Sequence, residues 1–465
     1  MSPPSRAEPP IPAPGDLRRS VSWPAAVLVA SGTAFLVTVS LGPMAPELGA
    51  VSPLVWAFTA AVGALQCLLI AELASLLPAR AGGTATYAQE ALRRVSPLLG
   101  AVSSWAYWFA WTPGIVVNLI LAADYLRHAL QLDADPLPIA LVLAASLYGL
   151  NALGLRTSMR VSAVAALLAL GPLVAMAVGL LLRPSLVRAE HLSPFAVPGH
   201  PWTALSAWKL LLKWTFVAAW SSYGAEIAST VVAEMQDART RIPYAMIAAA
   251  VTGLLAFGLV PVMLLAAVGA QGLGEDPLVV FLPLARAVFG DHGNVAVGLM
   301  LGSALVLGAQ AFIVGSSRTV FQMTRDRHLP SVFARVNRRG VPIGSIVWDA
   351  AVILTLLLVF GGDVVDVVAA ANVGYLLVFV LLPIAYLSLR AHHLASIARP
   401  FTLPPPFAAV AVALAAFNAL VLVVGGAQWG AKVLITGTAV TLLIVPLSLA
   451  TRWRAGAISL TDEEA

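Results

Sequence analysis

One apolar stretch of the sequence, WSSYGAEIAS at residues 220–229, carries polar and helix-weakening side chains where a membrane-spanning helix would be uniformly apolar. Its five candidate substrate-binding residues are Trp220, Ser221, Ser222, Tyr223 and Gly224. An unwound turn at membrane depth is tolerated only where its backbone groups line a cavity or are buried in protein. Carbonyls freed there can accept hydrogen bonds from an ammonium group, and the Trp220 ring attracts a cation by about 1–2 kcal/mol once water is excluded. The stretch therefore has the chemistry of an amine-binding site.

A second interruption is expected in the first apolar stretch, where the motif SLGP covers residues 40–43. Pro43 cannot donate the helix hydrogen bond, and Gly42 adopts backbone angles that other residues avoid, so the helix is expected to break there. The freed amides of Ser40, Leu41 and Gly42 would stand at the N-terminus of a half-helix, whose partial positive charge favours a carboxylate. A simple proline kink is the alternative if this break is taken alone.

The two interruptions occupy corresponding positions, because each lies in the first helix of a predicted set of five. Such pairs indicate a transporter built from inverted repeats, with its substrate bound between the two breaks. Amides on one side and carbonyls on the other suit a zwitterionic or cationic substrate. The pattern predicts transport of an amino acid or a related amine.

The composition indicates which elements position these residues. The chain of 465 residues is 60% hydrophobic and 11% charged, with a mean hydropathy of +0.89, which indicates an all-α polytopic membrane protein. Twelve transmembrane helices are predicted, at about residues 25–47, 53–77, 97–127, 136–154, 160–183, 209–233, 243–270, 292–324, 344–361, 364–390, 406–425 and 430–451. Two segments between them, 79–94 and 277–289, are predicted to be surface or re-entrant helices.

The predicted organisation has four parts. They are a disordered cytoplasmic tail at 1–22, an inverted-repeat transporter core at 23–395, helices 11 and 12 within 396–452, and a cytoplasmic C-terminal tail at 453–465. Within the core, helices 1–5 cover about residues 25–183 and helices 6–10 about residues 209–390.

Charge predicts the orientation. Most of the 27 lysine and arginine residues fall on one side of the predicted spans, and the positive-inside rule makes that side cytoplasmic. Both termini are then cytoplasmic, and the protein is predicted in the cell (inner) membrane as a monomer or homodimer. The pI of about 9.6 reflects contact with the lipid bilayer and not with nucleic acid, because the basic residues form no compact face. The single cysteine, Cys67, excludes an intramolecular disulfide, and no metal or other cofactor is predicted.

Two carboxylates within predicted spans are candidate gating or proton-responsive groups. An ionised carboxylate in a span costs about 2.5–3.5 kcal/mol, so Glu226 is expected to face water or a partner. The alternative for Glu226 is a structural hydrogen bond to a neighbouring helix. For Glu72 a structural or inner-gate role is favoured, with Arg80 or an arginine of the eighth helix as its partner.

Three polar or aromatic residues elsewhere are secondary cavity candidates. Trp111 and Asn118 lie in the third predicted helix and Gln310 in the eighth. Each taken alone is more typical of helix packing or helix–helix hydrogen bonding than of substrate contact.

Several of these motifs resemble the amino acid-polyamine-organocation permeases. WSSYGAEIASTVVAEMQDARTRIPYA is similar to that family's sixth helix and the following loop, and its Trp-Ser-x-x-Gly-x-Glu order is most similar to the arginine/agmatine exchanger branch. AELASLLPARAGGTATYA, SSRTVFQMTRDRHLP and LNALGLR are similar to the ends of its second, eighth and fourth helices. SLGP more closely resembles the Ser-Gly-Gly-Pro form of a polyamine-transporting branch. The resemblance covers about residues 25–400.

The resemblance implies a fold and a mechanism. The fold has ten core helices in a five-plus-five inverted repeat, with helices 1 and 6 unwound at their centres, and two peripheral C-terminal helices. The mechanism is alternating access, in which a bundle containing helices 1 and 6 rocks against a scaffold containing helices 3 and 8. By position, the residues Ser40 to Gly42 would hold the substrate carboxylate, carbonyls from Trp220 to Tyr223 its amino group, and the Trp220 ring would occlude the site.

The resemblance leaves alternatives for the coupling and the substrate. Ala169 stands where some proton-coupled relatives carry a lysine, which leaves H⁺ carried by another group such as Glu226, Na⁺ coupling, or substrate exchange. A cationic amino acid or a polyamine is favoured as substrate. A neutral amino acid permease and a non-transporting solute sensor are the alternatives, and an enzyme is disfavoured because the seven histidines are scattered over both sides.

Overall fold

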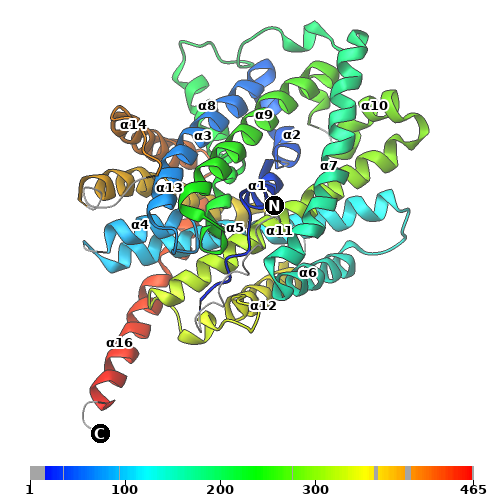
Figure 1. Cartoon of the computed structure of the whole chain (residues 1–465). Coiled ribbons are helices and arrows are strands. Elements are labelled where there is room, and N and C mark those ends of the chain that lie inside the picture. Colours follow the sequence, from blue (N-terminus) through cyan, green and yellow to red (C-terminus); the bar gives the residue numbers. More distant parts are fainter. Residues whose placement is uncertain are drawn as a thin grey trace, which may run out of the picture.

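The computed structural model describes residues 16–34, 36–93, 95–274, 276–360, 365–392 and 400–462, without the side chains of residues 37–40, 360, 365–367, 392 and 454–462. Over these ranges the chain is a bundle of helices with two isolated β-bridges and no strand (Figure 1). The predicted all-α class is confirmed.

The helices up to residue 204 are α1 (Trp23–Ala34), α2 (Val37–Leu48), η1 (Gly49–Val51), α3 (Ser52–Leu76), α4 (Thr84–Leu92), α5 (Pro97–Ala129), α6 (Pro136–Leu153), α7 (Leu155–Leu182), η2 (Pro184–Leu186) and η3 (Ala189–Leu192). The later ones are α8 (Leu205–Ser222), η4 (Tyr223–Glu234), α9 (Ala238–Gly272), α10 (Pro277–Phe289), η5 (Gly290–His292), α11 (Gly293–Arg325), η6 (Ser331–Ala334), α12 (Ile343–Phe360), α13 (Val365–His392), α14 (Phe407–Leu420), the π-helical η7 (Val421–Gly425), α15 (Ala431–Leu442) and α16 (Ile444–Asp462).

Nine helical stretches within the described ranges are long and apolar enough to cross a membrane. Shorter apolar helices are α1 and the part Ile343–Val359 of α12. These lengths and compositions fit a polytopic membrane protein. The total of twelve spans stays a prediction, since the sixth predicted span does not qualify as one continuous α-helix.

Local signals set several helix starts where the sequence predicts them. Pro97 and Pro136 stand in the first turn of α5 and α6, where a missing N–H breaks no helix bond. Asp135 and Asp276 cap α6 and α10, because each carboxylate accepts a hydrogen bond of 2.7 Å from the backbone N–H two residues later. The starts of these helices are therefore local properties of the chain.

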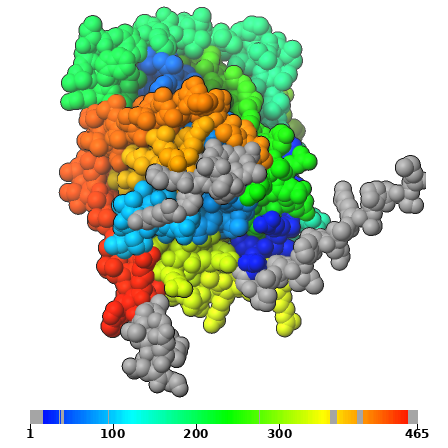
Figure 2. All heavy atoms as spheres, turned by 60° about the vertical axis from the view of Figure 1, so that its left-hand side comes forward, coloured from blue at the N-terminus to red at the C-terminus, as the bar shows by residue number. Residues whose placement is uncertain are grey.

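The bundle has two distinct ends. In Figure 1 the segment 183–204, which links α7 to α8, covers the top of the bundle, and α16 projects beyond the bottom. Figure 2 shows the same two ends, with the green 183–204 region at the top and red α16 at the bottom. We call the end with residues 183–204 the distal face and the end with residues 16–22 and 326–342 the N-terminal face.

Two helix pairs make the broadest contacts, α5 with α11 and α3 with α9. Small residues let α5 and α11 approach closely. A Cβ on Gly298 or Gly302 of α11 would lie 2.7 or 2.6 Å from side chains of α5. Close packing through small residues is how helices associate in a membrane, where no hydrophobic force drives them together.

The first predicted span is interrupted, but not at the predicted place. α1 ends at Ala34 and α2 begins at Val37, so the motif at 40–43 lies inside α2 and the predicted break there is wrong. Tertiary packing explains the observed position. A Cβ on Gly32 would lie 2.4 Å from a backbone carbonyl oxygen of α11, so the end of α1 is held in backbone contact with α11. The prolines inside α2 each remove one hydrogen bond, which a helix tolerates as a kink.

The sixth predicted span is interrupted where the sequence predicts. α8 ends at Ser222, and the chain continues from Tyr223 as the 3-10 helix η4, 12 residues long. Runs of 3-10 helix beyond about four residues are uncommon and often mark a hinge or strain. A Cβ on Gly224 would lie 2.6 Å from the Thr33 side chain, so η4 touches the last turn of α1. The two interruptions therefore meet in space.

Three predicted peripheral segments take part in the fold. Residues 16–22 lie against the N-terminal face, whereas residues 1–15 are outside the described ranges. The helix α16 runs to Asp462, through most of the predicted C-terminal tail. The segment predicted as a surface or re-entrant helix at 79–94 contains α4, which is almost wholly buried against α5 and α13.

Candidate functional site

Trp220 lies in the last turn of α8, directly before η4. Its side chain is buried, with 8% of the residue surface exposed. The indole Nε1 donates a hydrogen bond of 3.1 Å to the carbonyl of Ala110 on α5. Gly114 on the next turn of α5 makes room for the ring, since a Cβ there would lie 2.9 Å from it. The hydrogen bond and the glycine hold the indole against α5.

Three further aromatic rings surround that of Trp220. The rings of Trp111 and Phe312 lie 6.0 and 5.8 Å from it, centroid to centroid, and stack on each other at 4.7 Å. Tyr375 of α13 meets Trp111 edge to face at 4.8 Å. We call these four rings the aromatic enclosure. Aromatic faces carry partial negative charge, so the enclosure favours a cation.

Four buried polar atoms in or near the enclosure have no hydrogen-bond partner among the described residues. Trp111 Nε1 and the Tyr375 hydroxyl belong to its rings. The other two are Ser222 Oγ, two residues after Trp220, and Asn118 Oδ1, one turn beyond Gly114. The other amide atom of Asn118, Nδ2, donates to the Gly114 carbonyl at 2.8 Å. Buried polar atoms in native proteins nearly always have a partner. These atoms mark positions for water or for polar groups of a substrate.

Glu226 lies on η4 and is fully buried. Its carboxylate accepts hydrogen bonds from the Tyr107 hydroxyl, at 2.7 and 2.9 Å to its two oxygens, and from the Thr84 hydroxyl. The ring of Tyr107 also meets that of Trp111 edge to face at 5.9 Å. The carboxylate thus joins η4 to α4 and α5 and contacts the aromatic enclosure through Tyr107. No lysine, arginine or histidine of the described chain forms an ion pair with it.

The candidates from the first helix lie apart from the enclosure. Leu41 and Gly42 line a separate cavity of about 240 Å³ with residues of α9 and α10, and the side chain of Ser40 lies outside the described part. Because Leu36 is the N-cap of α2, its carbonyl accepts the first helix hydrogen bond, from the N–H of Ser40. The Leu36 N–H donates to the Thr33 carbonyl at 3.1 Å, so the N–H groups without a helical partner are those of residues 37–39. None of the predicted amide set belongs to them.

The remaining candidates of the second interruption face neighbouring helices. The Tyr223 hydroxyl donates a hydrogen bond of 3.0 Å to Asn418 Oδ1, so its side chain turns towards α14. Ser221 is fully buried. The carbonyl oxygen of Ser222 lies 3.0 Å from where a Cβ on Gly63 would stand, so this carbonyl faces α3.

Gln310 is directed away from the enclosure. Its Oε1 accepts a hydrogen bond of 2.9 Å from Asn151 Nδ2, and its Nε2 donates to Asn151 Oδ1 at 3.2 Å and to Ser158 Oγ at 3.2 Å. This is the helix–helix hydrogen bonding that the sequence left as the alternative for Gln310. Of the three secondary candidates, the structure brings Trp111 and Asn118, but not Gln310, next to Trp220.

Glu72 is fully buried in α3, with partners that the sequence did not indicate. It accepts hydrogen bonds from the Tyr386 hydroxyl at 3.1 Å and the Leu403 backbone N–H at 2.9 Å, and Arg390 lies 3.7 Å away. The expected pairing with Arg80 or an arginine of the eighth helix is wrong. The reason is that α13, which carries Arg390, packs against α3.

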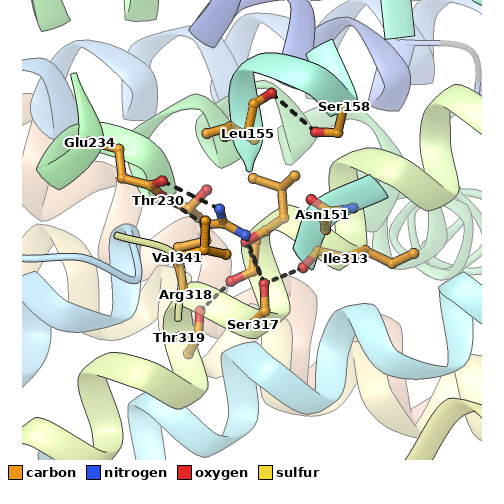
Figure 3. A network of polar contacts seen from close by, with 12 residues as sticks. Asn151, Leu155, Ser158, Thr230, Glu234, Ile313, Ser317, Arg318, Thr319 and Val341 are labelled. Carbon is orange, nitrogen blue, oxygen red and sulfur yellow. Dashed lines mark hydrogen bonds and ion pairs between the residues drawn. The ribbon is translucent and has the colours of Figure 1, made fainter. Parts of the chain in front are cut away.

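A buried ion pair joins η4 to α11 on the N-terminal side of the enclosure. Arg318 Nε lies 2.8 Å from Glu234 Oε1, and the exposed side-chain fractions are 0% and 3%. Figure 3 shows the Glu234 carboxylate turned towards the Arg318 guanidinium, whose Nη1 donates to Ser317 Oγ at 3.0 Å. Removing one partner of such a pair leaves a buried charge uncompensated. The pair therefore holds the end of η4 firmly against α11.

Further charged groups lie on the N-terminal face outside the spans. Arg80 bridges Glu90 at 2.5 Å and Asp326 at 2.6 Å. Burial raises the pKa of Asp326 above its usual value, although the Arg80 guanidinium acts in the opposite direction. Burial, helped by the Arg452 charge, lowers the pKa of His328 from 6.5 to about 4.

A more exposed ion pair joins α2 to α8 towards the distal face. Lys213 Nζ of α8 lies 2.8 Å from Glu47 Oε2 of α2, with exposed fractions of 23% and 41%. Trp214 Nε1 donates to the same carboxylate at 2.8 Å. The ammonium group also lies over the rings of Trp214 and Trp429, at 4.8 and 5.4 Å from their centroids.

Several residues of the site were missed from the sequence. Tyr107 lies four residues before Trp111, on the same face of α5, so helical spacing could have indicated it. Tyr375 is a polar aromatic residue in an apolar stretch, which is a weaker signal. Nothing in the sequence distinguishes Phe312 as a site residue, because phenylalanine is as common on lipid-facing positions as on buried ones.

A further buried carboxylate, Asp349 of α12, was also missed. It accepts hydrogen bonds from Trp108 Nε1 at 2.9 Å, the Tyr148 hydroxyl at 2.8 Å and Ser316 Oγ at 2.7 Å. These donors come from α5, α6 and α11. Asp349 thus cross-links the helices around the α5–α11 pair.

The groups gathered at this site are aromatic, polar and buried. Aromatic faces and an unpartnered hydroxyl surround the interruption of the sixth span, and a buried carboxylate lies behind one of the rings. Among the described residues, no three His, Cys, Asp or Glu side chains are grouped as ligands of a metal ion would be. The chemistry that these residues support is recognition.

Comparison with known proteins agrees with this description. The family model for amino acid permeases matches residues 21–447. An uncharacterised transporter of Mycobacterium tuberculosis is 27% identical over 441 residues, covering 91% of this chain and 93% of its own length. A proline-specific permease of Emericella nidulans is 29% identical over 43% of this chain and 38% of its own. An uncharacterised amino acid permease of Bacillus subtilis is 25% identical over 38% of this chain and 40% of its own.

Proposed function

Because the chain belongs to the amino acid permease family, we propose that it is a secondary active transporter that moves amino acids or related amines by alternating access. Family membership makes it a transporter and not an enzyme. The proposed substrate class rests on the aromatic enclosure at the α8–η4 interruption, where the first and sixth spans meet. Small amines are the substrates that such an enclosure suits.

A cationic amino acid or a polyamine is the favoured substrate. The rings of Trp220, Trp111 and Phe312 offer faces that attract a cation, by about 2 kcal/mol once water is excluded. Glu226 supplies a carboxylate behind Tyr107, and no ion pair within the described chain neutralises it. The unpartnered hydroxyl of Ser222 would accept from the ammonium group.

The substrate carboxylate would be held at the start of α2. The first four N–H groups of a helix lack intrahelical partners and stand at its positive end. In this chain they belong to residues 36–39, of which Leu36 already donates to the Thr33 carbonyl. The proposal therefore replaces Ser40, Leu41 and Gly42 by the three residues before Ser40.

Glu226 is proposed as the gating or proton-responsive acid. Its hydrogen bonds to Thr84 and Tyr107 join η4, in the moving bundle of the proposed mechanism, to α4 and α5. A change in its protonation would change which of these hydroxyls donates and which accepts. The assay below, run with and without each gradient, identifies the coupling ion as H⁺ or Na⁺. The same assay distinguishes exchange from symport.

A neutral amino acid permease is the second candidate. It is supported by the similarity to the proline-specific permease of Emericella nidulans. The enclosure would then bind a hydrophobic side chain. In either case the N-terminal face is proposed to be cytoplasmic, in agreement with the charge distribution of the sequence.

A counterflow assay in proteoliposomes tests the proposal. Labelled arginine, proline and putrescine are offered with and without proton and sodium gradients. We expect uptake of arginine or putrescine, which unlabelled substrate inside the vesicles accelerates. Uptake of proline alone would favour the second candidate. Saturable binding of any of them without flux would identify a solute sensor of the same fold. If none of the three is bound or transported, the proposed substrate class is contradicted.

A further inference from the structure

Residues 16–21 form an ordered segment across the N-terminal face, which we call the strap. Its end next to α1 pairs with the end of η4. The backbone N–H groups of Ser20 and Val21 both donate to the carbonyl of Glu234, at 2.8 and 2.9 Å. The N–H of Gln236 donates to the Val21 carbonyl at 2.8 Å, and the side chain of Val21 is buried. This end of the strap therefore belongs with α1 and η4.

The other end of the strap is attached to different elements. The Arg18 N–H donates to the carbonyl of Gly340, in the turn before α12, at 3.2 Å. Asp16 lies 3.2 Å from Arg325 at the end of α11. Leu17 is 8% exposed and packs in a small apolar cluster with Phe321 of α11 and with Ala233 of η4. The two polar contacts of Asp16 and Arg18 are therefore the ones that bind this end away from η4. In Figure 2 the first described residues, in dark blue, lie near the yellow-green residues of this region.

Glu234 is the point where the strap and the buried ion pair converge. Its backbone carbonyl accepts both hydrogen bonds from the strap, and its carboxylate binds Arg318 on α11. The end of η4 is thus held to α11 twice, once directly through Arg318 and once through the strap. Both connections cross from the first and sixth spans to the α5–α11 pair.

We propose that the strap is a cytoplasmic lock, whose release from α11 and from the turn at Gly340 is required before the N-terminal face opens. The inference rests on the proposed alternating-access function. In that cycle α1 and η4 move away from α11, and a strap of six residues cannot keep the contacts at both of its ends. Its residues 16–18 must leave the α11 side while Ser20 and Val21 travel with η4.

A reversible tether tests the lock directly. Asp16→Cys and Arg325→Cys are combined in a full-length chain whose buried Cys67 is replaced by alanine, and a short bifunctional methanethiosulfonate forms a disulfide with each of the two new cysteines and releases methanesulfinate. We expect the tethered protein to bind substrate but to lose at least about tenfold in transport rate, and reductant to restore it. Transport by the tethered protein at the rate of the untethered one would overturn the proposal. The Asp16→Cys single variant with the same reagent is the control.

A labelling experiment tests the opposite change, in which the lock is weakened. Ser229, on η4 and fully buried, is replaced by cysteine as a reporter of opening in the Cys67→Ala chain. Leu17→Asp places a charge in the apolar cluster and is expected to raise the rate of maleimide labelling about tenfold. Arg19→Ala is the matched control, because that side chain is exposed and its loss leaves the rate unchanged. Equal rates in both variants would contradict the lock.

The two experiments separate this inference from the proposed function. If the untethered protein moves none of the three amines, the proposed function fails, while labelling of Ser229→Cys still reports whether the strap controls opening. If transport proceeds and the tether has no effect, the lock fails and the transporter remains.

Discussion

The two faces of the bundle are closed in different ways. On the N-terminal face the ion pair between Glu234 and Arg318 is buried, with 3% and 0% of the side chains exposed, and the strap is seated on the Glu234 carbonyl. On the distal face the pair between Lys213 and Glu47 keeps 23% and 41% of its side chains exposed. Solvent screens the exposed pair and leaves the buried pair unscreened. The buried pair joins the sixth span to α11, whereas the exposed pair joins the first and sixth spans to each other.

The difference also says how each face is controlled. An exposed ion pair contributes little to the free energy of folding and breaks and re-forms readily. The contact of Lys213 with Glu47 is therefore broken at little cost in free energy. A buried pair contributes strongly only while both partners stay together, which makes it a two-state element. Buried groups thus join η4 to α11 at the N-terminal face, and partly exposed groups join α2 to α8 towards the distal face.

The largest expected effect comes from breaking the buried pair. Glu234→Gln leaves the Arg318 charge uncompensated and is expected to lower the free energy of unfolding by about 3–5 kcal/mol. Cys67 is fully buried, so its reaction with a fluorogenic maleimide during heating reports unfolding. The double variant Glu234→Leu, Arg318→Met replaces the pair by apolar groups and is expected to recover most of the loss. A loss below about 1 kcal/mol for Glu234→Gln would show that the buried and the exposed ion pair contribute equally little to stability.

The second effect depends on pH and is again confined to the N-terminal face. The pKa of His328 is lowered from 6.5 to about 4 in the folded state, so the unfolded chain binds the extra proton between these values. Stability is therefore complete above pH 6.5 and falls as the pH decreases towards 4, by up to about 3 kcal/mol. His328→Asn is expected to flatten this dependence in thermal unfolding measured across that range. His200→Asn, on the distal face, is the matched control and leaves the slope in place; a slope that survives in His328→Asn would contradict the assignment.

The third effect concerns the site between the two faces. Trp220→Leu removes the ring that the Ala110 carbonyl positions, and is expected to weaken binding of a cationic substrate by about 1–2 kcal/mol, roughly tenfold in Kd. Ser222→Ala removes a single hydroxyl and is expected to cost less. Equilibrium binding of labelled arginine to the purified variants measures both. Equal, small losses in the two variants would remove Trp220 from the site.

The smallest effect is expected at the distal pair. Glu47→Gln removes the partner of Lys213 and of the Trp214 indole, and is expected to change the free energy of unfolding by at most about 1 kcal/mol, less at high salt. The same Cys67 assay at low and high ionic strength measures it. A loss as large as that of Glu234→Gln would show that exposure does not distinguish the two faces.

Much of the fold could be predicted from the sequence because its signals are local. Apolar length, the prolines at the starts of α5 and α6, and the aspartate caps of α6 and α10 depend only on neighbouring residues. The α8–η4 interruption was predicted for the same reason, since two serines and a glycine weaken a helix wherever it packs. Trp220 and Glu226 could be named because they stand next to that local signal.

Other parts of the site could not be predicted, because they depend on which helices become neighbours. The break of the first span lies before SLGP because Gly32 presses against α11, a contact between residues far apart in the chain. Glu72 binds Arg390 and not Arg80 because α13 packs on α3. Gln310 turns to Asn151, while Phe312, two residues later on the same helix, reaches Trp220.

The sequence by itself therefore determined the helical membrane class, the weakened helix in the sixth span, and the presence there of an aromatic ring and an acid. The tertiary structure decided the location of the first break, the partners of Glu72 and Glu226, the enclosure of Trp220 by three other rings, and the seating of residues 16–21. The physical reason is the sequence separation over which each kind of interaction acts. Propensity, capping and hydropathy are properties of adjacent residues, whereas close packing and buried charge pairing are properties of surfaces that only folding brings together.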